Sequence, residues 1–474
     1  MLEYNLWRKK AMESIVRLAS LKISNIKNVK NGQIMMPNAC RKQLSYKNAE
    51  VLGIYGQNGS GKTAIIDTLY YLQEIMTGRT VEEEAADYID VNDNWAEISA
   101  DFYIFIEETI YEVNYRVILQ RDGKRAEIVR ETMSCAINKG NSRSNKTVFM
   151  DFQRADRENI FLPKKRLDEV VEANTENKTD LIVARKMAEK GNYSYIFGES
   201  SREIFCRIYE NNFKPYSEVI RALFRFALKD LFVIRNAHSG MISANFLLPV
   251  AFRIEQNEIG MKGDLAVPLT EPVVLNEERK KILDTIVEQI NMVLFTIIPG
   301  MRIDIYNYGK QLMDSGEDGY RVELVSVREN MPPIPIRMES EGIIKIISIL
   351  NVLIQAFGDA SVCLAIDELD AGIFEYMLGE LLDIFNKSAK GQLIFTSHNL
   401  RALEMLDKDS IMFSTANPDR RYIRMKNIKA SNNLRDMYLR GITLGGQDEV
   451  IYEETDSLRI ARAFRKAGRT ILHD

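Results

Sequence analysis

Gly56-Gln57-Asn58-Gly59-Ser60-Gly61-Lys62-Thr63 lies between the apolar run Val51–Tyr55 and the run Ala64–Met76, which has helical apolar spacing. The spacing fits G-x-x-x-x-G-K-[ST], the phosphate-binding loop that joins a strand to a helix. Glycines allow the backbone to turn tightly and point N–H groups at phosphate oxygens, and the following helix N-terminus adds a positive dipole end. We therefore predict that this P-loop binds a nucleotide.

The polar residues of the P-loop have distinct predicted tasks. Lys62 reaches the β- and γ-phosphates, and the hydroxyl of Thr63 can ligate Mg²⁺. The predicted nucleotide-binding residues are Gly56, Asn58, Gly59, Ser60, Gly61, Lys62 and Thr63. The alternative is a glycine-rich turn with an exposed lysine, but the strand before it and the helix after it favour the P-loop.

Length and composition limit the class of protein. At 474 residues the chain is too long for one compact core, so we expect two or three units. A hydrophobic content of 46% and a charged content of 27% are ordinary for a soluble protein and exclude wholesale disorder. The net charge of −4 offers no overall attraction for nucleic acid, so DNA or RNA would need a local basic patch.

Cysteines and histidines are few and scattered: Cys40, Cys135, Cys206 and Cys363, with His238, His398 and His473. No C-x-x-C spacing occurs, so neither a disulfide framework nor a zinc site is indicated. The sequence lacks a run of about 20 apolar residues, which a transmembrane helix needs, and residues 1–18 are unlike a signal peptide. We expect a cytoplasmic protein with no membrane partner.

The first half of the chain predicts a nucleotide-binding sheet with a second, antiparallel sheet beside it. Residues 1–17 are expected to be an N-terminal extension, and residues 18–135 the first part of the head. The predicted elements are a hairpin over 18–37 that turns at Lys30-Asn31-Gly32, and strands at Ile98–Ile106, Ile110–Gln120 and Arg125–Met133. Asp122-Gly123 is a strong hairpin signal between the last two strands.

Residues 136–300 are predicted to be a mostly helical insertion. Leu167–Ala188 and Ser217–Phe232 have helical apolar spacing, and a long helix is expected over Asn276–Pro299, beginning at an asparagine cap. No heptad pattern persists, so a long coiled-coil arm is not expected. Lys164-Lys165-Arg166 is interpreted as a solvated face, with contact to nucleic acid or a partner as the alternative.

Residues 301–430 are predicted to complete the head, and residues 431–474 to form a helical tail. An apolar helix over Gly342–Phe357 precedes an alternation of strand, helix and strand, which indicates a parallel sheet covered by helices. The predicted strands are 302–308, 320–327, 334–337, 362–366, 392–396, 410–413 and 422–428, with a helix at 374–385.

Two of these buried strands end in polar residues that suit phosphoryl transfer. Asp367 and Glu368 follow the strand 362–366, and we predict that Asp367 holds Mg²⁺ while Glu368 orients and deprotonates the attacking water. His398 follows the strand 392–396 at the same edge and is predicted to sense the γ-phosphate. The alternatives are an acidic turn after a core strand and a surface histidine.

These motifs resemble ABC-type ATPases. Asp367-Glu368-Leu369-Asp370 is similar to their Walker B motif and D-loop, and Thr396-Ser397-His398 to their switch histidine. Ser340-Glu341-Gly342 occupies the signature position. It lacks the two adjacent glycines of transporters and resembles the Ser-x-Gly form of the RecF/SMC-like and OLD-like AAA ATPases. The resemblance covers residues 18–135 and 300–430, outside the predicted insertion.

The resemblance implies an α/β fold: an ABC-type P-loop NTPase head with a mixed parallel core sheet, an antiparallel β subdomain and a helical insertion. It implies Mg²⁺-dependent ATP hydrolysis at composite sites between two heads, in a homodimer or a higher even-numbered homo-oligomer. Ser340, Gly342 and Asp370 would then contribute to nucleotide binding, although Ser340 could be only a helix cap. Gln120 resembles the Q-loop glutamine, a metal ligand, although many strand-end glutamines are inert.

The same resemblance suggests a regulator of prokaryotic anti-phage defence that acts with a separate effector protein, such as a nuclease of the TOPRIM-like kind. Little chain remains after His398, and its acids Glu449, Glu453, Glu454 and Asp456 do not follow a two-metal nuclease pattern. A RecF-like DNA-repair ATPase, which would need a basic stripe, is the main alternative. A transporter ATPase would need a membrane partner, and a nucleotide-binding scaffold would lack the base that Glu368 supplies.

Overall fold

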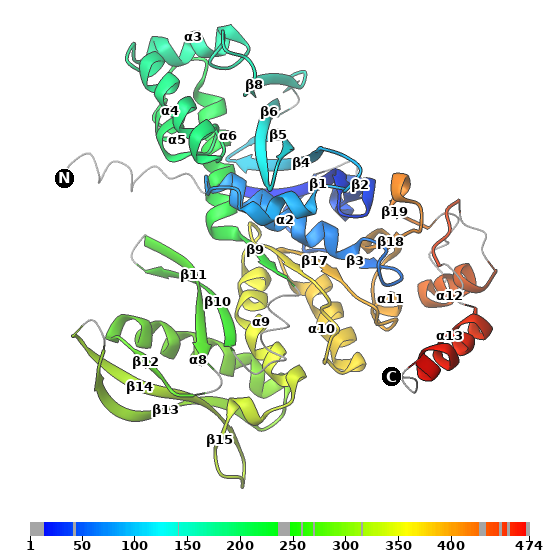
Figure 1. Ribbon diagram of the computed structural model, residues 1–474. Helices are drawn as coiled ribbons and strands as arrows, with labels where there is room; N and C mark the ends of the chain where they lie inside the picture. The colour runs from blue at the N-terminus through cyan, green and yellow to red at the C-terminus, as the bar shows by residue number, and fades with distance from the viewer. Residues whose placement is uncertain are drawn as a thin grey trace.

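The computed structural model describes residues 14–470, except 41–43, 141, 236–246, 257–258, 269–270, 314–315, 426–432, 445–447 and 453–455. Three layers of structure meet in it (Figure 1): an outer antiparallel sheet, a core sheet that carries the P-loop, and a smaller α/β unit. The predicted α/β fold, with mixed sheets and helices, is confirmed.

The core sheet has six strands in the order β19-β18-β3-β17-β16-β9. Pairing is parallel except between β18 and β19, so the carboxyl ends of the parallel strands meet at one edge. The strands are β3 (Glu50–Tyr55), β9 (Leu231–Ile234), β16 (Cys363–Ile366), β17 (Gln392–Thr396), β18 (Ile411–Ser414) and β19 (Tyr422–Ile423). Within the described residues, the predicted strand 422–428 is therefore only two residues long, and 426–428 lie outside them.

Helices cover both faces of the core sheet because its strands are apolar on both sides. Leu52 and Ile54 of β3 join the core that contains α2 (Lys62–Met76). Val51 and Tyr55 face the opposite way, toward α9 (Glu341–Gly358) and α10 (Glu375–Ser388). The predicted helices at these three places are confirmed.

The outer sheet has seven strands in the order β2-β1-β4-β5-β6-β7, with β8 also paired to β6. Its strands are β1 (Ile15–Ile26), β2 (Val29–Met35), β4 (Trp95–Ile106), β5 (Thr109–Asp122), β6 (Arg125–Lys139), β7 (Ser142–Arg143) and β8 (Thr147–Gln153). The predicted antiparallel strands and the hairpin at Asp122-Gly123 are confirmed. Residues 15–17 belong to β1, so the predicted N-terminal extension is too long.

The first hairpin turns at Lys27 and Asn28, not at Lys30-Asn31-Gly32 as predicted. Lys27 has a φ of 53°, in the left-handed region that a tight turn requires. Gly32 lies inside β2, where a Cβ atom would stand 2.5 Å from the Tyr422 ring. The glycine is therefore explained by the close approach of that ring and not by a turn.

The predicted helical insertion over 136–300 is only partly correct. Four helices pack against the outer sheet: α3 (Lys164–Ala173), α4 (Asn177–Gly191), α5 (Glu199–Cys206) and α6 (Lys214–Arg225). The predicted helix Ser217–Phe232 ends in a π-helical turn at Phe226–Asp230, and Leu231–Ile234 is β9 of the core sheet. A short apolar run suits either a helix or a buried strand, and pairing with β16 decides it here.

Residues 247–335 form a separate α/β unit. Residues 301–335 were predicted to belong to the second part of the head, which was wrong. The α/β unit contains β10 (Leu247–Gln256), β11 (Ile259–Pro268), β12 (Val273–Leu275), α8 (Glu277–Ile297), β13 (Met301–Leu312), β14 (Asp318–Arg328) and β15 (Ile334–Pro335). Asn276 caps α8 as predicted, since its side chain accepts a hydrogen bond from the Arg279 N–H at 2.9 Å.

Helix α9 connects this unit to the core sheet. Ile347 and Leu350 belong to the core of the α/β unit, whereas Val352 and Ala356 belong to the core beneath β3. Of the described helices, α9 alone is long and apolar enough to cross a membrane, but 67% of it is buried inside the protein. Its apolar character is therefore explained by contact with two cores.

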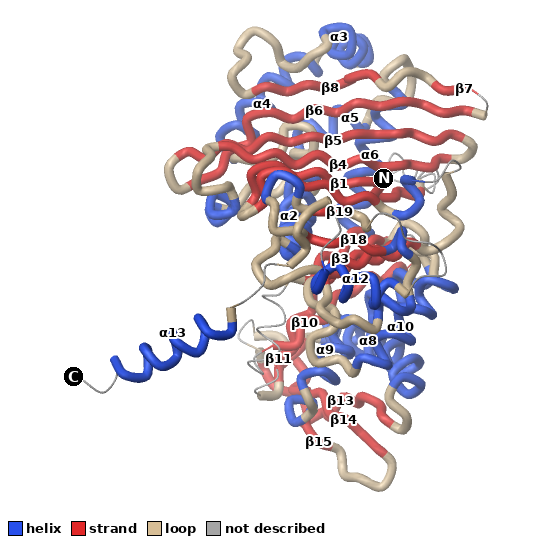
Figure 2. The backbone as a smooth tube through the Cα atoms, turned by 90° about the vertical axis from the view of Figure 1, so that its right-hand side faces the viewer, coloured by secondary structure: helices blue, strands red, loops and turns tan. Residues whose placement is uncertain are grey.

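The predicted helical tail is present in the described part of residues 431–474. Helix α12 (Leu434–Leu444) packs Leu434 and Tyr438 into the core, whereas α13 (Ser457–Thr470) projects from the body of the molecule (Figure 2).

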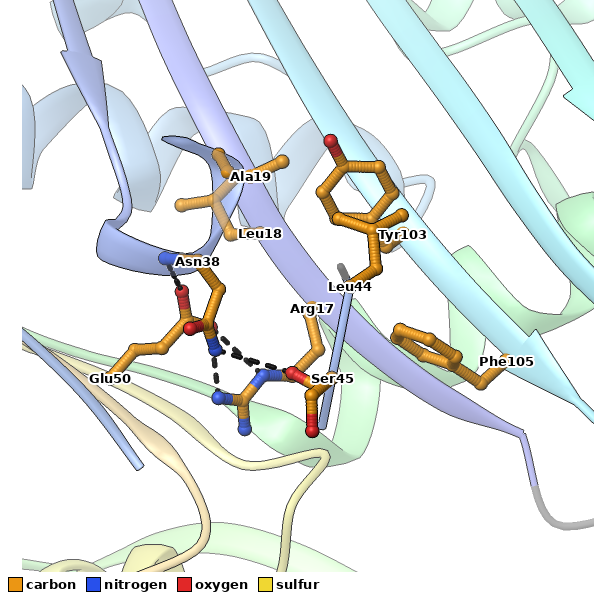
Figure 3. Close-up of a pocket in the computed structure, with 10 residues that line it drawn as sticks. Arg17, Leu18, Ala19, Asn38, Leu44, Ser45, Glu50, Tyr103 and Phe105 are labelled. Atoms are coloured by element: carbon orange, nitrogen blue, oxygen red, sulfur yellow. Dashed lines mark hydrogen bonds and ion pairs between the residues drawn. The ribbon is translucent and has the colours of Figure 1, made fainter. Parts of the chain in front are cut away.

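A buried ion pair joins the two large sheets at the end away from the P-loop. Figure 3 shows Arg17 of β1 and Glu50 of β3 pointing toward each other beside a small pocket. The Arg17 guanidinium donates to Glu50 Oε2 at 2.8 Å, and to the Ala360 and Lys390 carbonyl oxygens at 2.8 and 2.6 Å. Glu50 Oε1 accepts from the Asn38 N–H at 2.8 Å, so the charges are buried with their partners.

We expect Arg17→Ala to lower the free energy of unfolding by about 3–5 kcal/mol, because it would leave the Glu50 carboxylate buried and unpaired. Chemical denaturation measures the difference. The control is Arg143→Ala, which breaks a pair with Glu112 in which the arginine is 63% exposed. That change should cost about 1 kcal/mol or less. Equal losses in the two variants would contradict the stabilising role of the buried pair.

Candidate nucleotide-binding site

The P-loop leaves β3 at Tyr55 and enters α2 at Lys62, as predicted. Gly61 has a φ of 86°, a conformation that side chains with a Cβ rarely adopt. At Gly56, a Cβ would lie 1.9 Å from Ser414 Oγ. In the described part of the chain no side chain caps the start of α2, so its first N–H groups remain available to an anion.

Lys62 lies across its own loop. Its Nζ donates to the carbonyl oxygens of Gly56 and Gln57 at 2.9 and 3.1 Å. Burial lowers the pKa of Lys62, and the nearby charges of Asp367, Glu368 and Asp370 act in the opposite direction. A phosphate in the loop would replace the two carbonyls with a charged acceptor, which makes a stronger hydrogen bond.

The other P-loop residues divide into an exposed tip and a buried base. Asn58 and Gly59 are exposed at the tip. Ser60 is buried, and its hydroxyl donates to the Gln57 carbonyl at 2.6 Å. Ser60 therefore stabilises the loop in this structure, whereas the tip is accessible to a ligand.

Asp367 lies at the end of β16, almost fully buried. Its Oδ1 accepts from Thr396 Oγ1 at 2.6 Å and lies 3.4 Å from Thr63 Oγ1. Its Oδ2 is buried and has no hydrogen-bond partner among the residues that the structure describes. A carboxylate oxygen in need of a ligand, beside a threonine hydroxyl, is a donor set that suits Mg²⁺. The residues present therefore fit the predicted metal.

Glu368 has a backbone conformation that is unusual for a residue with a side chain, with a φ of 48°. Hydrogen bonds hold it on both sides. Its N–H donates to Thr396 Oγ1 at 2.7 Å, and its carbonyl oxygen accepts from Lys345 Nζ. The turn places the half-buried Glu368 side chain directly after the metal-facing Asp367.

His398 and Asp370 meet at the end of β17. The His398 N–H donates to Asp370 Oδ2 at 3.0 Å. Partial burial and the charge of Lys62 lower the pKa of His398, which favours the neutral imidazole. The structure thus brings the predicted P-loop, acidic pair, Asp370 and His398 to one edge of the core sheet.

Ser340 and Gly342 lie at the start of α9. The Ser340 hydroxyl accepts from the Ile343 N–H at 3.4 Å, so Ser340 is a helix cap in this structure. At Gly342, a Cβ would lie 1.8 Å from the Gly372 carbonyl oxygen, so the glycine allows α9 to pack against the turn after Asp370. Neither residue has a described contact with the P-loop of its own chain.

The structure does not bring Gln120 to the site, and its predicted metal role is corrected accordingly. Gln120 is exposed in β5 of the outer sheet, where it pairs with Trp95 and Glu127. The strand beside β16 is β9, whose next residue is Arg235. The sequence led to the wrong strand because β9 was included in a predicted helix.

Two cationic residues at the site were not predicted. Lys345 is buried beneath the acidic turn, and burial lowers its pKa. It is the only charged residue in the apolar run 342–357, and this isolated charge in the sequence could have indicated a functional role. Arg235 forms an ion pair with Asp67 of α2 at 3.0 Å and donates to the Tyr88 hydroxyl at 2.8 Å. Only the three-dimensional pairing of β9 reveals its position.

The segment 414–422 contacts the base of the P-loop. The sequence did not predict this contact. The Tyr422 hydroxyl donates to the Gly61 carbonyl at 2.6 Å. Ser414 Oγ donates to the Tyr55 carbonyl at 3.1 Å and also contacts Ser60 Oγ. These contacts fix the base of the loop in advance of any ligand.

Comparison with known proteins gives one sequence match. Residues 20–204 match the family described as AAA domain, a segment that includes the P-loop and ends before Asp367. No curated protein matches the chain. This segment is similar to that family, and the geometry above shows a P-loop between a strand and a helix in an α/β fold.

Solved structures of SMC head domains and of RecF superpose on the chain only loosely. The Smc head domain with a coiled coil and joint from Pyrococcus yayanosii is 13% identical, with coverage of 90% of this chain and 100% of that chain and a TM-score of 0.40. RecF with ATPrS is 10% identical (86% and 98% covered, TM-score 0.35). The SMC head from Thermotoga maritima is 12% identical (86% and 99% covered, TM-score 0.33). The fold assignment therefore rests on the strand order and P-loop geometry.

Proposed function

We propose that the chain is an Mg²⁺-dependent ATPase that works as a switch, with composite ATP sites between two heads. One observation carries this proposal. Asp367 Oδ2, which has no partner among the described residues, lies at the P-loop near the hydroxyl of Thr63. The next residue, Glu368, supplies a second carboxylate and is held in a strained turn. A protein that only bound nucleotide would not require Glu368.

Each residue has a role that follows from its position. Lys62 and the N–H groups at the start of α2 would bind the phosphates, and Thr63 and Asp367 would hold the metal. Bound Mg²⁺ would neutralise charge that develops on the phosphate oxygens. Glu368 would orient and deprotonate water, and the neutral His398 would donate a hydrogen bond to the γ-phosphate.

Ser340, Gly342 and Asp370 are proposed to act across a dimer interface. Ser340 is exposed at the N-terminus of α9, where the helix dipole favours an anion. The close packing of Gly342 on Gly372 holds this helix end against the turn that follows Asp370. A second head that presented its bound γ-phosphate to this surface would complete the site.

We expect Ser340→Arg to leave ATP binding to one chain intact but to block ATP-dependent pairing of heads, because a bulky cation would obstruct the γ-phosphate contact. Light scattering with and without ATP, in a Glu368→Gln background, measures the pairing. Ser340→Ala is the control for loss of the helix cap alone, which costs about 1 kcal/mol. Unchanged pairing in Ser340→Arg would leave Ser340 with only the capping role.

We further propose that ATP turnover regulates a separate effector protein, such as a nuclease, in prokaryotic anti-phage defence. The defence role rests on the resemblance of the Ser-x-Gly signature to OLD-like ATPases. The separate effector is supported by the acidic residues of the tail, two of which make structural hydrogen bonds. Glu449 binds Asn417 at 3.0 Å, and Asp456 accepts from the Leu458 N–H at 2.9 Å at the start of α13. Glu453 and Glu454 lie outside the described residues.

We expect the purified chain to cleave neither plasmid DNA nor tRNA when it is incubated with ATP and Mg²⁺ or Mn²⁺. Gel electrophoresis of the nucleic acids measures cleavage, and a Glu453→Ala/Asp456→Ala double variant is the control. Cleavage that survives purification and disappears in this variant would place a nuclease site in the tail and contradict a separate effector.

The second candidate function is a RecF-like DNA-binding ATPase. It is favoured by α13, in which Arg459, Arg462 and Arg465 are exposed without any acidic residue in the helix. ATP-dependent binding of a fluorescent DNA duplex, lost in Arg462→Glu/Arg465→Glu, would support this function over the first.

A further inference from the structure

Lys345 is a buried cation on the side of α9 that packs against the core sheet, where its residue is 5% exposed. Positions 342, 345, 349 and 352 are three or four residues apart, so they share one face of the helix. On this face Gly342 lies against Gly372, and Ile349 and Val352 belong to the core beneath β3. The other three positions are therefore glycine or apolar, and packing alone does not explain a lysine among them.

The ammonium group of Lys345 contacts the backbone of the acidic turn. Its Nζ donates to the Glu368 carbonyl oxygen, which also accepts from the Ala371 N–H at 3.0 Å. The turn thus has a hydrogen bond of its own and does not need the lysine to satisfy this carbonyl. Burial lowers the pKa of Lys345, and the three carboxylates of the turn oppose this effect. Because a buried cation is costly, its place under this turn suggests a functional role.

Glu368 needs support on both sides because its backbone lies in the left-handed region, with a φ of 48°. A residue with a Cβ persists there only where its neighbours hold it. Thr396 holds one side, since its Oγ1 accepts from the Glu368 N–H at 2.7 Å and donates to Asp367 Oδ1 at 2.6 Å. Lys345 holds the other side through the carbonyl oxygen. Together these contacts fix the direction in which the Glu368 side chain leaves the turn.

We propose that Lys345 is a positioning residue for ATP hydrolysis, which keeps the Glu368 carboxylate in the orientation that activates water. It acts through the Glu368 backbone and not through contact with ATP. This inference rests on the proposed ATPase function and adds a residue to it. A displacement of about 1 Å in a reacting group can cost about 100-fold in rate, so a backbone support of this kind can matter as much as the base itself.

Lys345→Met tests the inference, because methionine is flexible and packs well in apolar surroundings but donates no hydrogen bond. We expect kcat for ATP hydrolysis to fall about tenfold or more, and the Kd for ATP to change by less than about twofold. Phosphate release measures the rate, and anisotropy of a fluorescent ATP analogue measures binding. If Lys345→Met does not fold, Lys345→Gln gives the same comparison, since its amide is polar but uncharged and one bond shorter.

A double-mutant cycle distinguishes positioning of Glu368 from a general structural effect. Once Glu368→Gln has removed the base, Lys345 has no base to position. Lys345→Met/Glu368→Gln should therefore hydrolyse ATP within about twofold of Glu368→Gln alone. A structural role would lower the residual rate by the same factor as in the parental chain.

Ser348→Ala is the matched control on α9. It removes another buried polar group from the helix, a hydroxyl that donates to the Lys345 carbonyl oxygen at 2.7 Å. Because this hydrogen bond lies within α9 and leaves the Lys345 ammonium in place, kcat should stay within about twofold of the parental value.

Two results would overturn the inference. The first is a folded Lys345→Met chain that binds ATP and hydrolyses it at the parental rate. The second is an equal loss of rate on Lys345→Met with and without Glu368→Gln. Failure of the proposed function is a different result: the parental chain would not hydrolyse ATP, or Glu368→Gln would hydrolyse it at the parental rate.

Discussion

Glu368→Gln is expected to slow ATP hydrolysis by about 100-fold or more while ATP binding is retained. Glutamine keeps the size of the side chain but cannot accept a proton from the attacking water. The turn should persist, because the Glu368 carbonyl oxygen still accepts from Lys345 and the Glu368 N–H still donates to Thr396. Phosphate release measures hydrolysis, and anisotropy of a fluorescent ATP analogue measures binding.

The matched control is Glu329→Gln, which removes an exposed carboxylate from the α/β unit, outside the candidate site. It should hydrolyse ATP at the parental rate. A Glu368→Gln chain that also hydrolysed ATP at the parental rate would show that Glu368 is not the base.

Lys62→Ala is expected to abolish ATP binding. In the free protein the Lys62 ammonium donates to Gly56 and Gln57 of the loop, and it is the cation placed to meet the β- and γ-phosphates. Its loss removes charge-assisted hydrogen bonds that no neighbouring P-loop residue can replace. Isothermal titration calorimetry with ATP and Mg²⁺ measures the effect.

The control for charge alone is Lys190→Ala on the exposed face of α4, which should bind ATP normally. Thermal unfolding of Lys62→Ala should show that the chain remains folded, since the two carbonyl groups can bind water instead. Retained ATP binding by a folded Lys62→Ala chain would contradict the assignment of the P-loop.

The sequence predicted the centre of the site because its signals are local. The Gly-rich loop, the buried strands at 51–55, 362–366 and 392–396, and the polar residues directly after them are all short segments. Parallel strands bring their carboxyl ends to one edge, so the motifs alone were sufficient to place Lys62, Asp367 and His398 together.

The remaining features depend on contacts between distant residues. Leu231–Ile234 has the length of a strand, but only its register with β16 distinguishes it from the end of a helix. That pairing puts Arg235, and not Gln120, at the end of the strand next to β16. In the same way, Gly32 resembles a turn residue in the sequence, and only the Tyr422 ring against it explains the glycine. Helical apolar spacing at 167–188 and 217–232 indicated a helical insertion, but it did not reveal β10 and β11, which precede the correctly predicted α8.

A crystal structure of the Glu368→Gln chain grown with ATP and Mg²⁺ tests the proposed site most directly. We predict the β- and γ-phosphates within hydrogen-bond distance of Lys62, and a metal ion about 2.0–2.1 Å from Thr63 Oγ1 on the side of Asp367 Oδ2. Nucleotide bound elsewhere on the chain, or metal that contacts neither Thr63 nor Asp367 directly or through one water, would contradict it.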